Sequence, residues 1–511
     1  MKGFCKLFSI ALFLLVSLGI ASASAGDIYI SQSGSGGANG STCANAYPAN
    51  FFNSSSNWGS ADTQIGPGTT AHLCGTISTS LTAQANGSSG NPVTILFESG
   101  AKLSQPVCNA MTGCLSLNGR SYITVDGGSN GLIQNTANGT GLANHGGSRG
   151  ISADGCNNCE IRNLEISNIY LRSSNSDISF DQTGVTCIHF SGSNWQIHDN
   201  VMHDTGWCLD NFWQSGDSNV KIYNNDIYNI DHAYAVAGTS GSASGFYFYN
   251  NHVHDFAKWD SGSANTFHHD GVHAYGVNGA KQTDVWIYGN QFDGDIGANV
   301  TGYIFMEGGS GSGSTPWSDG TGVVRIFNNV FSAPNRSVYG MVQVHAGATA
   351  QIFNNTVTGT SDSICVDLSN VNSISFENNI VQNCNTLVYL HDGAKVATVD
   401  YNLYGNSASN ALVFNSTFIG LTALSSWKST CNCDAHSLVS NLVSNLLAPL
   451  TGGSGVGDGA NLSGLGIAAL TKDKNGNARP PSPTAWDMGP FASGSAAPGP
   501  QPPTGLTATV K

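Results

Sequence analysis

The sequence predicts an all-β protein whose chain winds into a parallel β-solenoid closed by a cap at each end. The first observation is a recurring template of two short apolar-alternating strands around an Asn, as in WQIHDNVMHD and VKIYNNDIYN. The second is composition: only 10% of the 511 residues are charged and 64 are Gly, which is typical of turn-rich β structure. The third is that the repeats show no helical period.

Eight copies of the template align on one Asn each. These residues are Asn200, Asn225, Asn251, Asn290, Asn329, Asn355, Asn379 and Asn402, at intervals of 23 to 26 residues except for two of 39. A unit of this length provides three short strands, each pairing with its counterparts in the coils above and below. Asn suits a corner because it tolerates left-handed backbone angles and its amide can bond to the next Asn in the stack. We therefore expect a structural ladder here.

The ends of the chain differ from the solenoid. Residues 1–25 carry two lysines, an apolar stretch and then small residues, which predicts a signal peptide and a secreted or periplasmic product. No later stretch is long and apolar enough to predict a membrane span. Residues 492–511 are rich in Pro and Gly and predict a flexible tail. Residues 26–491 remain for one solenoid domain with its caps.

The charge balance narrows the partners. The chain has 18 Lys and Arg against 32 Asp and Glu, with a formal net charge of −14. This excess of acidic residues argues against a nucleic-acid partner and against an anionic membrane surface. It also gives no electrostatic steering of polyanions. We expect a monomer.

The cysteines predict disulfides. Of 13 Cys, Cys5 lies in the signal peptide, and an even number remains for an oxidising compartment. The candidate pairs are Cys108 with Cys114, Cys156 with Cys159, and Cys187 with Cys208. A zinc site at CNNC is the weaker alternative, because no second pair lies at zinc-finger spacing.

The segments outside the coils resemble the ends of a known fold. GDIYISQSGSGG and GTTAHLCGTIS are similar to the opening of secreted β-helix proteins, and LSSWKSTCNCDAHSLVSN and KDKNGNARPPSPTAWDMGPF are similar to their closing segments. Together with the coils, at about residues 70 to 420, they resemble the right-handed parallel β-helix of the pectin-lyase-like superfamily. The resemblance implies this fold and a polysaccharide substrate. Polygalacturonase motifs resembling NTD, DD, GHG and RIK do not occur in that form, so no catalytic residue is carried over.

A further strand in each coil predicts a functional face. It ends near a Gly or a turn, as in TCIHFSG, GVHAYG and VQVHAG, and alternate residues face solvent if the aliphatic ones face inward. The outward set is His189, Asp210, Ala235, His273, Tyr275, Glu307, Gln343, His345, Asp367, Tyr389 and His391. Neighbouring strands lie about 4.8 Å apart, so acids one or two coils apart are separated by roughly the span that glycosidase carboxyls require. Aligning the preceding turn places Asp231 beside His269 and His232 beside Asp270.

The two 39-residue intervals contain insertions next to these strands. AKWDSGSANTF spans 257 to 267, and GSGSGSTPWSDGTG spans 309 to 322. Insertions in solenoids map to loops that often form the walls of a binding face. They bring Trp259 and Trp317, whose rings suit stacking on sugars, although packing within the loops is an equal alternative.

These features favour a secreted glycoside hydrolase that acts through paired carboxylates. Asp270 and Glu307 are the predicted acid/base pair, with His269 and His273 as orienting groups and Asp210 and Asp231 as support. The predicted substrate contacts are His232, Trp259, Trp317, Tyr275 and His345.

Two other functions stay open at this point. A polysaccharide lyase needs a cation to neutralise a uronate carboxylate, and basic residues are scarce in the polar coils, where Lys258 and Lys281 are the nearest. A glycan-binding surface solenoid without catalysis is the non-enzymatic alternative, because the outside of a β-helix is polar in any case.

The stretch NTFHHDGVHAYG, residues 265 to 276, raises the question of a metal site made of His268, His269, Asp270 and His273. On a strand, His269 and His273 lie about 13 Å apart, which argues against chelation within the stretch. Metal ligands would have to come from adjacent coils, for example Asp231 and His232. The sequence therefore predicts no required cofactor, although Asp side chains could build a Ca²⁺ site.

Overall fold

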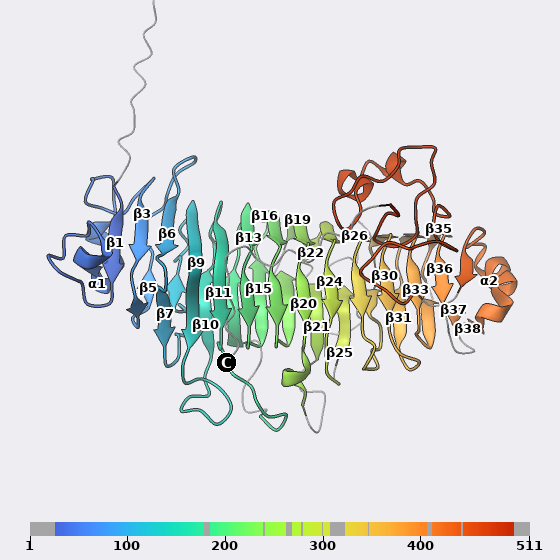
Figure 1. The fold of residues 1–511 in the computed structure, drawn as a ribbon, viewed down its shortest axis with the longest axis horizontal. Coiled ribbons are helices and arrows are strands. Elements are labelled where there is room, and N and C mark those ends of the chain that lie inside the picture. Colours follow the sequence, from blue (N-terminus) through green and yellow to red (C-terminus); the bar gives the residue numbers. More distant parts are fainter. Residues whose placement is uncertain are drawn as a thin grey trace, which may run out of the picture.

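The fold is a right-handed parallel β-helix, as predicted (Figure 1). The structure is a computed structural model, and it describes residues 26–177, 184–238, 241–261, 268–276, 280–298, 300–306, 322–345, 347–391, 393–405, 411–440 and 443–494. The predicted signal peptide and most of the predicted tail lie outside the described residues. Within these ranges, no helix has the length and apolar character needed to cross a membrane.

Three stacks of strands form the walls of the β-helix, and strands within a stack pair in parallel from coil to coil. The first stack consists of β1 (Ile28–Ser31), β3 (Thr70–Leu73), β6 (Val93–Phe97), β9 (Ile123–Asn135), β11 (Glu160–Ser167), β13 (Trp195–His198), β16 (Ser218–Tyr223), β19 (Ser242–Tyr249), β23 (Asp284–Tyr288), β26 (Val323–Phe327), β29 (Thr349–Phe353), β32 (Ser373–Glu377) and β35 (Val396–Asp400). Two short strands flank it: β2 (Tyr47–Pro48) pairs with β1, and β22 (Lys281–Gln282) pairs with β19.

The second stack follows the first around a corner, and β9 and β11 are long enough to belong to both. Its other members are β4 (Thr76–Ile77), β7 (Lys102–Gln105), β14 (Val201–His203), β17 (Asp226–Tyr228), β20 (His252–His254), β24 (Gln291–Asp293), β27 (Val330–Ser332), β30 (Thr356–Thr358), β33 (Ile380–Gln382), β36 (Leu403–Gly405) and β39 (Leu438–Ser440).

The third stack carries the predicted functional face. It consists of β10 (Ser148–Ala153), β12 (Val185–Phe190), β15 (Trp207–Trp213), β18 (His232–Gly238), β21 (His269–Gly276), β25 (Val300–Met306), β28 (Val342–His345), β31 (Ile364–Ser369), β34 (Thr386–Leu390), β37 (Leu412–Phe414) and the antiparallel β38 (Thr417–Ile419). The short pair β5 (Leu81–Thr82) and β8 (Leu115–Ser116) precedes β10, and β8 contacts it.

The core lies inside the coils and follows from the alternation of the strands. In β23, Val285 and Ile287 are buried, whereas Asp284, Trp286 and Tyr288 keep part of their surface in water. Successive side chains on a strand point to opposite faces, so this pattern places one aliphatic layer per coil in the interior. Stacking the coils joins these layers into one continuous hydrophobic core.

A ladder of asparagines runs along the corner between the first and second stacks. From Asn200 to Asn379, the main-chain N–H and the side-chain amide of each Asn both donate to Oδ1 of the Asn in the next coil, at 2.9–3.2 Å. The same amide also donates to a main-chain carbonyl of the preceding coil, as from Asn225 to Ile197. The ladder confirms the structural role predicted for these residues.

One detail of that prediction is wrong. The left-handed backbone belongs to the residue before each ladder Asn, such as Asn224, Asn250 and Asn328, with φ between 55° and 56°. The preceding residue makes the bend, so the ladder Asn is free to hold its amide in the interior of the corner, where it is shielded from water.

Caps close both ends of the core. At the N-terminus, the helix α1 (Ala49–Asn53) buries Phe52, whose ring packs edge-on against Trp58 at 5.0 Å. At the C-terminus, α2 (Leu424–Cys431) and the turn that follows it end the ladder. Asn402 donates its N–H to Ser437 at 2.8 Å and its amide to Asp434 at 3.3 Å.

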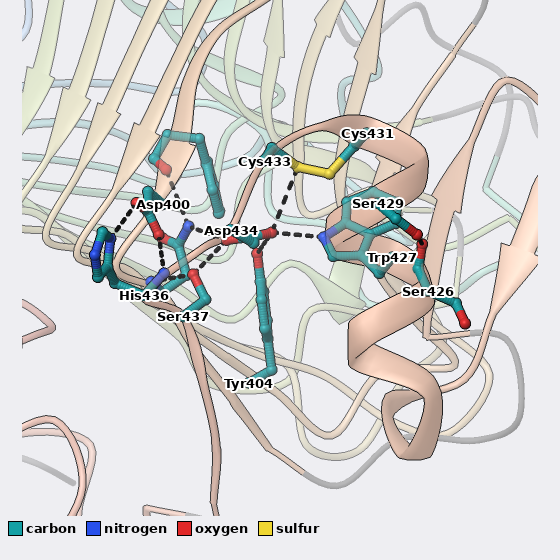
Figure 2. Close-up of a disulfide and its surroundings, with 12 residues drawn as sticks. Asp400, Tyr404, Ser426, Trp427, Ser429, Cys431, Cys433, Asp434, His436 and Ser437 are labelled. Carbon is teal, nitrogen blue, oxygen red and sulfur yellow. Dashed lines mark hydrogen bonds and ion pairs between the residues drawn. A yellow bond between two sulfur atoms is a disulfide. The ribbon is translucent and has the colours of Figure 1, made fainter.

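Figure 2 shows how this second cap holds Asp434. The buried carboxylate accepts hydrogen bonds from Trp427 Nε1 at 2.6 Å and from the Tyr404 hydroxyl at 3.0 Å, beside the Cys431–Cys433 disulfide. Burial raises the pKa of Asp434, although its four hydrogen-bond donors oppose that effect.

The segment 472–491, expected to cap the solenoid, instead lies along its side. Residues 443–494 run back over the outer surface of the later coils, where they are drawn in red (Figure 1). Leu470 and Trp486 cover Phe327 and Phe353 of the first stack. Asn354, from a corner of the coils, donates to the carbonyl of Asp487. The reason is that outward aromatic residues of the first stack offer an apolar surface at this place, which the segment removes from water.

The described irregular segments contain six short 3-10 helices: η1 (Cys43–Asn45), η2 (Ser55–Asn57), η4 (Ala257–Trp259), η5 (Leu421–Ala423), η6 (Ser463–Leu465) and η7 (Ala468–Thr471). These belong to the caps, to the first insertion and to the C-terminal segment. The described coils themselves are built from strands and tight corners.

Four disulfides cross-link the described residues: Cys43–Cys74, Cys108–Cys114, Cys365–Cys384 and Cys431–Cys433. The predicted Cys108–Cys114 pair is confirmed. The other two predicted pairs are wrong: Cys156 and Cys159, and Cys187 and Cys208, are neighbouring buried thiols without a sulfur–sulfur bond. Four disulfides are consistent with an oxidising, non-cytoplasmic compartment.

Replacing a central ladder residue should destabilise the whole solenoid. Asn329→Ala removes the acceptor of two hydrogen bonds from Asn290 and the donor to the Ile287 carbonyl. Buried polar groups left without partners cost about 1–3 kcal/mol each, so we expect a loss of about 3 kcal/mol in the free energy of unfolding. Urea unfolding followed by circular dichroism measures it. The exposed Gln196→Ala on β13 is the control, with a change within about 0.5 kcal/mol.

Candidate functional site

One row of side chains runs along the third stack. The pairing register aligns Ser152, His189, Asp210, Ala235, His273, Phe305, Gln343, Asp367 and Tyr389 on successive coils. Apart from Ser152 and Phe305, these residues belong to the outward set that the sequence predicts, Asp210 included. Glu307 comes one residue after the end of β25 and lies outside the described residues.

The central feature of this face is a group of four side chains, His232, His268, Asp270 and His273, which we call the His/Asp cluster. One nitrogen or oxygen atom of each lies within 4.8 Å of the corresponding atom of every other. His232 begins β18 and Asp270 pairs with it in β21, as the alignment of the turns predicted. The side chains of His232 and Asp270 have no exposed surface, and that of His268 is 35% exposed.

Asp270 Oδ2 lies at the middle of the cluster. It is 3.2 Å from Nε2 of His232, 3.4 Å from Nδ1 of His273 and 3.7 Å from Nε2 of His268. This oxygen nevertheless has no hydrogen-bond partner of good geometry, although it is buried. The other oxygen, Oδ1, accepts the N–H of Gly302 at 3.2 Å, which fixes the carboxylate to the next coil.

Two more carboxylates, those of Asp231 and Asp260, accept hydrogen bonds from the imidazoles of His232 and His269. Asp231 accepts a hydrogen bond from His232 Nδ1 at 2.7 Å and, through its other oxygen, from His269 Nδ1 at 3.0 Å. His269 in turn reaches Asp260, in the first insertion, at 2.9 Å. Asp231 is therefore beside His269, as predicted. Burial disfavours charge on both Asp231 and His232, yet their pairing lowers the pKa of Asp231 to about 2 and raises the pKa of His232 to about 9.

The spacing argument against chelation within residues 265–276 did not consider every pair of residues in the stretch. It considered His269 and His273, whereas Asp270 and His273, three residues apart, contact each other. The pairing of β21 with β25 shifts register between His269 and Asp270. Such an irregularity re-aims a side chain, so Asp270 turns to the face of His273 while His269 points toward Asp231.

A second ionisable group lies on the coils before the cluster. His189 Nδ1 is 2.5 Å from Asp210 Oδ2, and His189 Nε2 is 3.1 Å from Asp154 Oδ1. Burial lowers the pKa of His189, but hydrogen bonds to the two carboxylates outweigh burial and raise it to about 9. Asp210 and His273 are separated by the coil of Ala235, so Asp210 does not join the cluster.

A third group lies on the coils after the cluster. Buried Asp367 is 2.8 Å from His391 Nε2 and 3.6 Å from His345 Nε2. His345 also packs edge-on against Phe305 at 5.8 Å. The predicted substrate contact His345 thus lies on the same face as the cluster, with 23% of its side chain exposed.

The predicted aromatic contacts have different surroundings. Trp259 is 2% exposed and packs between Tyr170 and the guanidinium of Arg172, so the loop packing considered for it is observed and its ring has no open face. Tyr275 is half-buried and lies 4.9 Å from the His273 ring. Trp317 lies outside the described residues.

Two contributors, Asp260 and Asp154, were missed as site residues. His268 belongs to the run that raised the question of a metal site, but it is not among the predicted site residues. Asp260 lies in a loop and Asp154 lies at the end of a strand. At such positions the two-residue alternation does not predict which way a side chain points. Their only signal was proximity: Asp260 belongs to the first insertion, and Asp154 directly follows β10.

A polar pocket opens along the same edge of the third stack. It has a volume of about 720 Å³ and is lined by Ser80, Gln105, Val107, Cys108, Asn109, Ala110, Ala143, Asn144, His145, Gly146 and Gly147. Ser80 precedes β5 and Gly147 precedes β10, just as His232 and Asp270 lie at the starts of their strands. Three coil steps, roughly 15 Å, separate β10 from β18.

Comparison with known proteins shows similarity in fold alone. No protein-family model matches the sequence, and no curated protein is significantly similar to it. Among solved structures, the GH136 lacto-N-biosidase from Eubacterium ramulus is 10% identical, with a TM-score of 0.44 over 82% of this chain and 68% of that one. Pectate lyase Pel9A is 12% identical, with a TM-score of 0.34 over 92% and 98%. The PL6 family alginate lyase AlyGC is 12% identical, with a TM-score of 0.26 over 68% and 51%. Similarity at this level assigns no substrate or catalytic residue to this chain.

The His189 pairing should make stability depend on pH. Because the pKa of folded His189 lies above the ordinary 6.5, its stabilising effect is complete below pH 6.5 and is lost as the pH rises through 9. The stability advantage of the wild type over His189→Gln should therefore shrink by about 2–3 kcal/mol across that window. Urea unfolding of both proteins at a series of pH values measures it.

The exposed Gln196→Ala, which removes no ionisable group, serves as the control, and its difference from wild type should stay nearly constant. A constant difference for His189→Gln as well would contradict the assignment.

Proposed function

We propose that this protein is a polysaccharide-cleaving enzyme whose reaction takes place at the His/Asp cluster. The observation that carries the proposal is the cluster itself: four ionisable side chains gathered almost out of water. Burying such groups costs free energy, and strongly interacting ionisable groups of this kind gather at functional sites. A purely structural solenoid gains nothing from this arrangement that aliphatic residues would not provide.

The shape of the face supports a polymeric substrate. The polar pocket near β10 and the cluster at β18 and β21 lie along one edge of the third stack, on a line parallel to the axis of the solenoid. A sugar chain lying along this edge meets the pocket and the cluster with different units. The pocket offers amide and hydroxyl groups from Ser80, Gln105, Asn109 and Asn144, which suit hydrogen bonds to sugar hydroxyls.

Hydrolysis remains the preferred reaction. The net charge of −14 gives no attraction for polyanionic substrates, which favours an uncharged glycan over a polyuronate. We keep Asp270 and Glu307 as the proposed carboxylate pair; Met306, the residue before Glu307, pairs with Ala274 beside His273. Because Asp270 has no exposed surface, it acts from behind His268 and His273, which reach solvent.

Elimination is the second candidate, and one residue favours it. Arg149 on β10 donates from Nη1 to the Met111 carbonyl, next to the pocket-lining Ala110. This guanidinium is a cation that could neutralise a uronate carboxylate, which is what a lyase needs. The sequence alone does not single out Arg149; it predicts Lys258 and Lys281 as the basic residues nearest to the polar coils.

Turnover should depend on the proposed carboxylates. Asp270→Asn and Glu307→Gln should each lower kcat by about 100-fold or more, because a general acid or base contributes that much to catalysis and the buried Asp270 acts through His268 and His273. A panel of polysaccharides is assayed for new reducing ends and for the ultraviolet absorbance of unsaturated uronates. Reducing ends alone indicate hydrolysis, and the absorbance indicates elimination.

His436→Ala in the distant cap should retain wild-type activity. Full activity in both carboxylate variants would show that the site is wrong, and retention on immobilised glycan without any product would show the protein to be a binding module.

A further inference from the structure

We infer that the His/Asp cluster is a binding site for one divalent transition-metal ion, with Zn²⁺ as the best-fitting member of that class. The proposed ligands are Nε2 of His232, Nε2 of His268, Oδ2 of Asp270 and Nδ1 of His273. The inference concerns binding and stands apart from the reaction proposed above. It replaces the sequence-based prediction that no cofactor is required.

The distances between the four atoms are those of a ligand shell. Four ligands at the 2.0–2.1 Å typical of zinc lie about 3.3 Å from one another around a tetrahedron. The observed separations are 3.2 Å between His232 and Asp270, 3.3 Å between His232 and His273, 3.4 Å between His273 and Asp270, and 3.7 Å between His268 and Asp270. Four of the six edges are therefore close to the expected length.

Asp270 supplies the independent sign of a missing ligand. Its Oδ2 is buried, three imidazole nitrogens surround it, and none of them makes a hydrogen bond of good geometry to it. A buried carboxylate oxygen normally has a partner, and leaving it without one costs free energy. A cation at the centre of the cluster provides that partner without moving any side chain far.

The residues behind the ligands match the usual support of a metal site. A ligand histidine commonly donates its other N–H to a carboxylate, which sets the tautomer and the ring orientation. Asp231 does this for His232, so Nε2 faces the centre of the cluster, and a bound metal displaces the proton that this nitrogen carries. The Gly302 N–H holds the second oxygen of Asp270 in the same way. The three buried carboxylates Asp231, Asp260 and Asp270 also provide charge that a dication offsets.

The ligand types select the class of ion. Ca²⁺ takes six to eight oxygen ligands, and this cluster offers one carboxylate oxygen among three imidazole nitrogens. Imidazole with a carboxylate suits zinc and its first-row neighbours. The cluster therefore does not fit the Ca²⁺ site that the sequence left open.

A second group of Asp and His side chains differs from the His/Asp cluster in how its nitrogens and carboxylates are paired. Asp226, His252 and His254 lie close together on the second stack. There, each imidazole nitrogen already has a carboxylate within 3.3 Å, from Asp226, Asp255 or Asp293. His252 and His254 donate hydrogen bonds to all three of these carboxylates, and no buried side-chain atom of the group lacks a partner, so the group is satisfied as a network of ion pairs. This makes His252 a matched control.

The test measures metal bound to the full chain. Purified protein is stripped with a chelator, loaded with ZnCl₂, gel-filtered and analysed for zinc by mass spectrometry, and affinity is measured by competition with a chromophoric chelator. We expect one Zn²⁺ per chain for the wild type and for His252→Ala. His268→Ala and Asp270→Asn should bind about 100-fold more weakly or worse. With Co²⁺ in place of Zn²⁺, the visible absorption of a four-coordinate ion should be seen in the wild type and lost in His268→Ala.

The outcomes separate this inference from the proposed function. Folded wild type that retains no stoichiometric zinc, or His268→Ala and Asp270→Asn with wild-type affinity, overturns the metal site. Loss of zinc in His252→Ala alone overturns it too, because the ion would then lie on the second stack. If Asp270→Asn fails to fold by circular dichroism, the half-buried His268→Ala decides. Bound zinc without cleavage of any glycan leaves the metal site standing and removes only the proposed reaction.

Discussion

Hydrogen bonding between successive coils is the constraint on which the rest of the molecule depends, because one coil buries almost nothing by itself. The strands satisfy their main-chain groups in the parallel ladders, and the difficulty arises at the corners, where strand pairing stops. The asparagine amides solve it on one side: each Oδ1 takes both donors of the Asn before it, and each amide also reaches a carbonyl of the preceding coil. The corner is thereby as fully bonded as the strands, and the coils cannot slip relative to one another without breaking the whole series.

The fixed register of the strands allows charged side chains to be held together in a buried position. Asp231, His232 and Asp270 have no exposed surface, and groups of this kind are costly to bury unless they are held in good geometry. Here neighbouring strands set the spacing between coils, and Asp231 and the Gly302 N–H orient the two groups they contact. Side chains far apart in the sequence therefore meet without the flexibility of a loop. The rigid stack around the cluster holds these groups in good geometry and so offsets the free-energy cost of burying them.

The sequence was most informative where a period determines structure. The spacing of the asparagines predicted the solenoid, the alignment of the third-stack segments placed Asp210 with His189 in the outward set, and the turns placed His232 beside Asp270. It was least informative where the period breaks. The register shift after His269 turns Asp270 toward His273, which alternation alone could not show. The burial of Trp259 depends on Tyr170 and Arg172 from another loop, and the path of residues 443–494 depends on an apolar surface assembled from several coils.

The C-terminal end of the asparagine ladder has to be closed by hydrogen-bond acceptors. The series has a direction, since every rung donates toward the C-terminal end, so whatever follows Asn402 must accept. Ser437 and Asp434 accept there, locked by Trp427 and Tyr404 (Figure 2). Without this cap, the last coil would expose hydrogen-bond donors and unpaired strand edges. A coil from another copy of the chain could pair with them. The small helix α2 and the turn that holds buried Asp434 thus cover the edge along which a second copy of the chain could otherwise add.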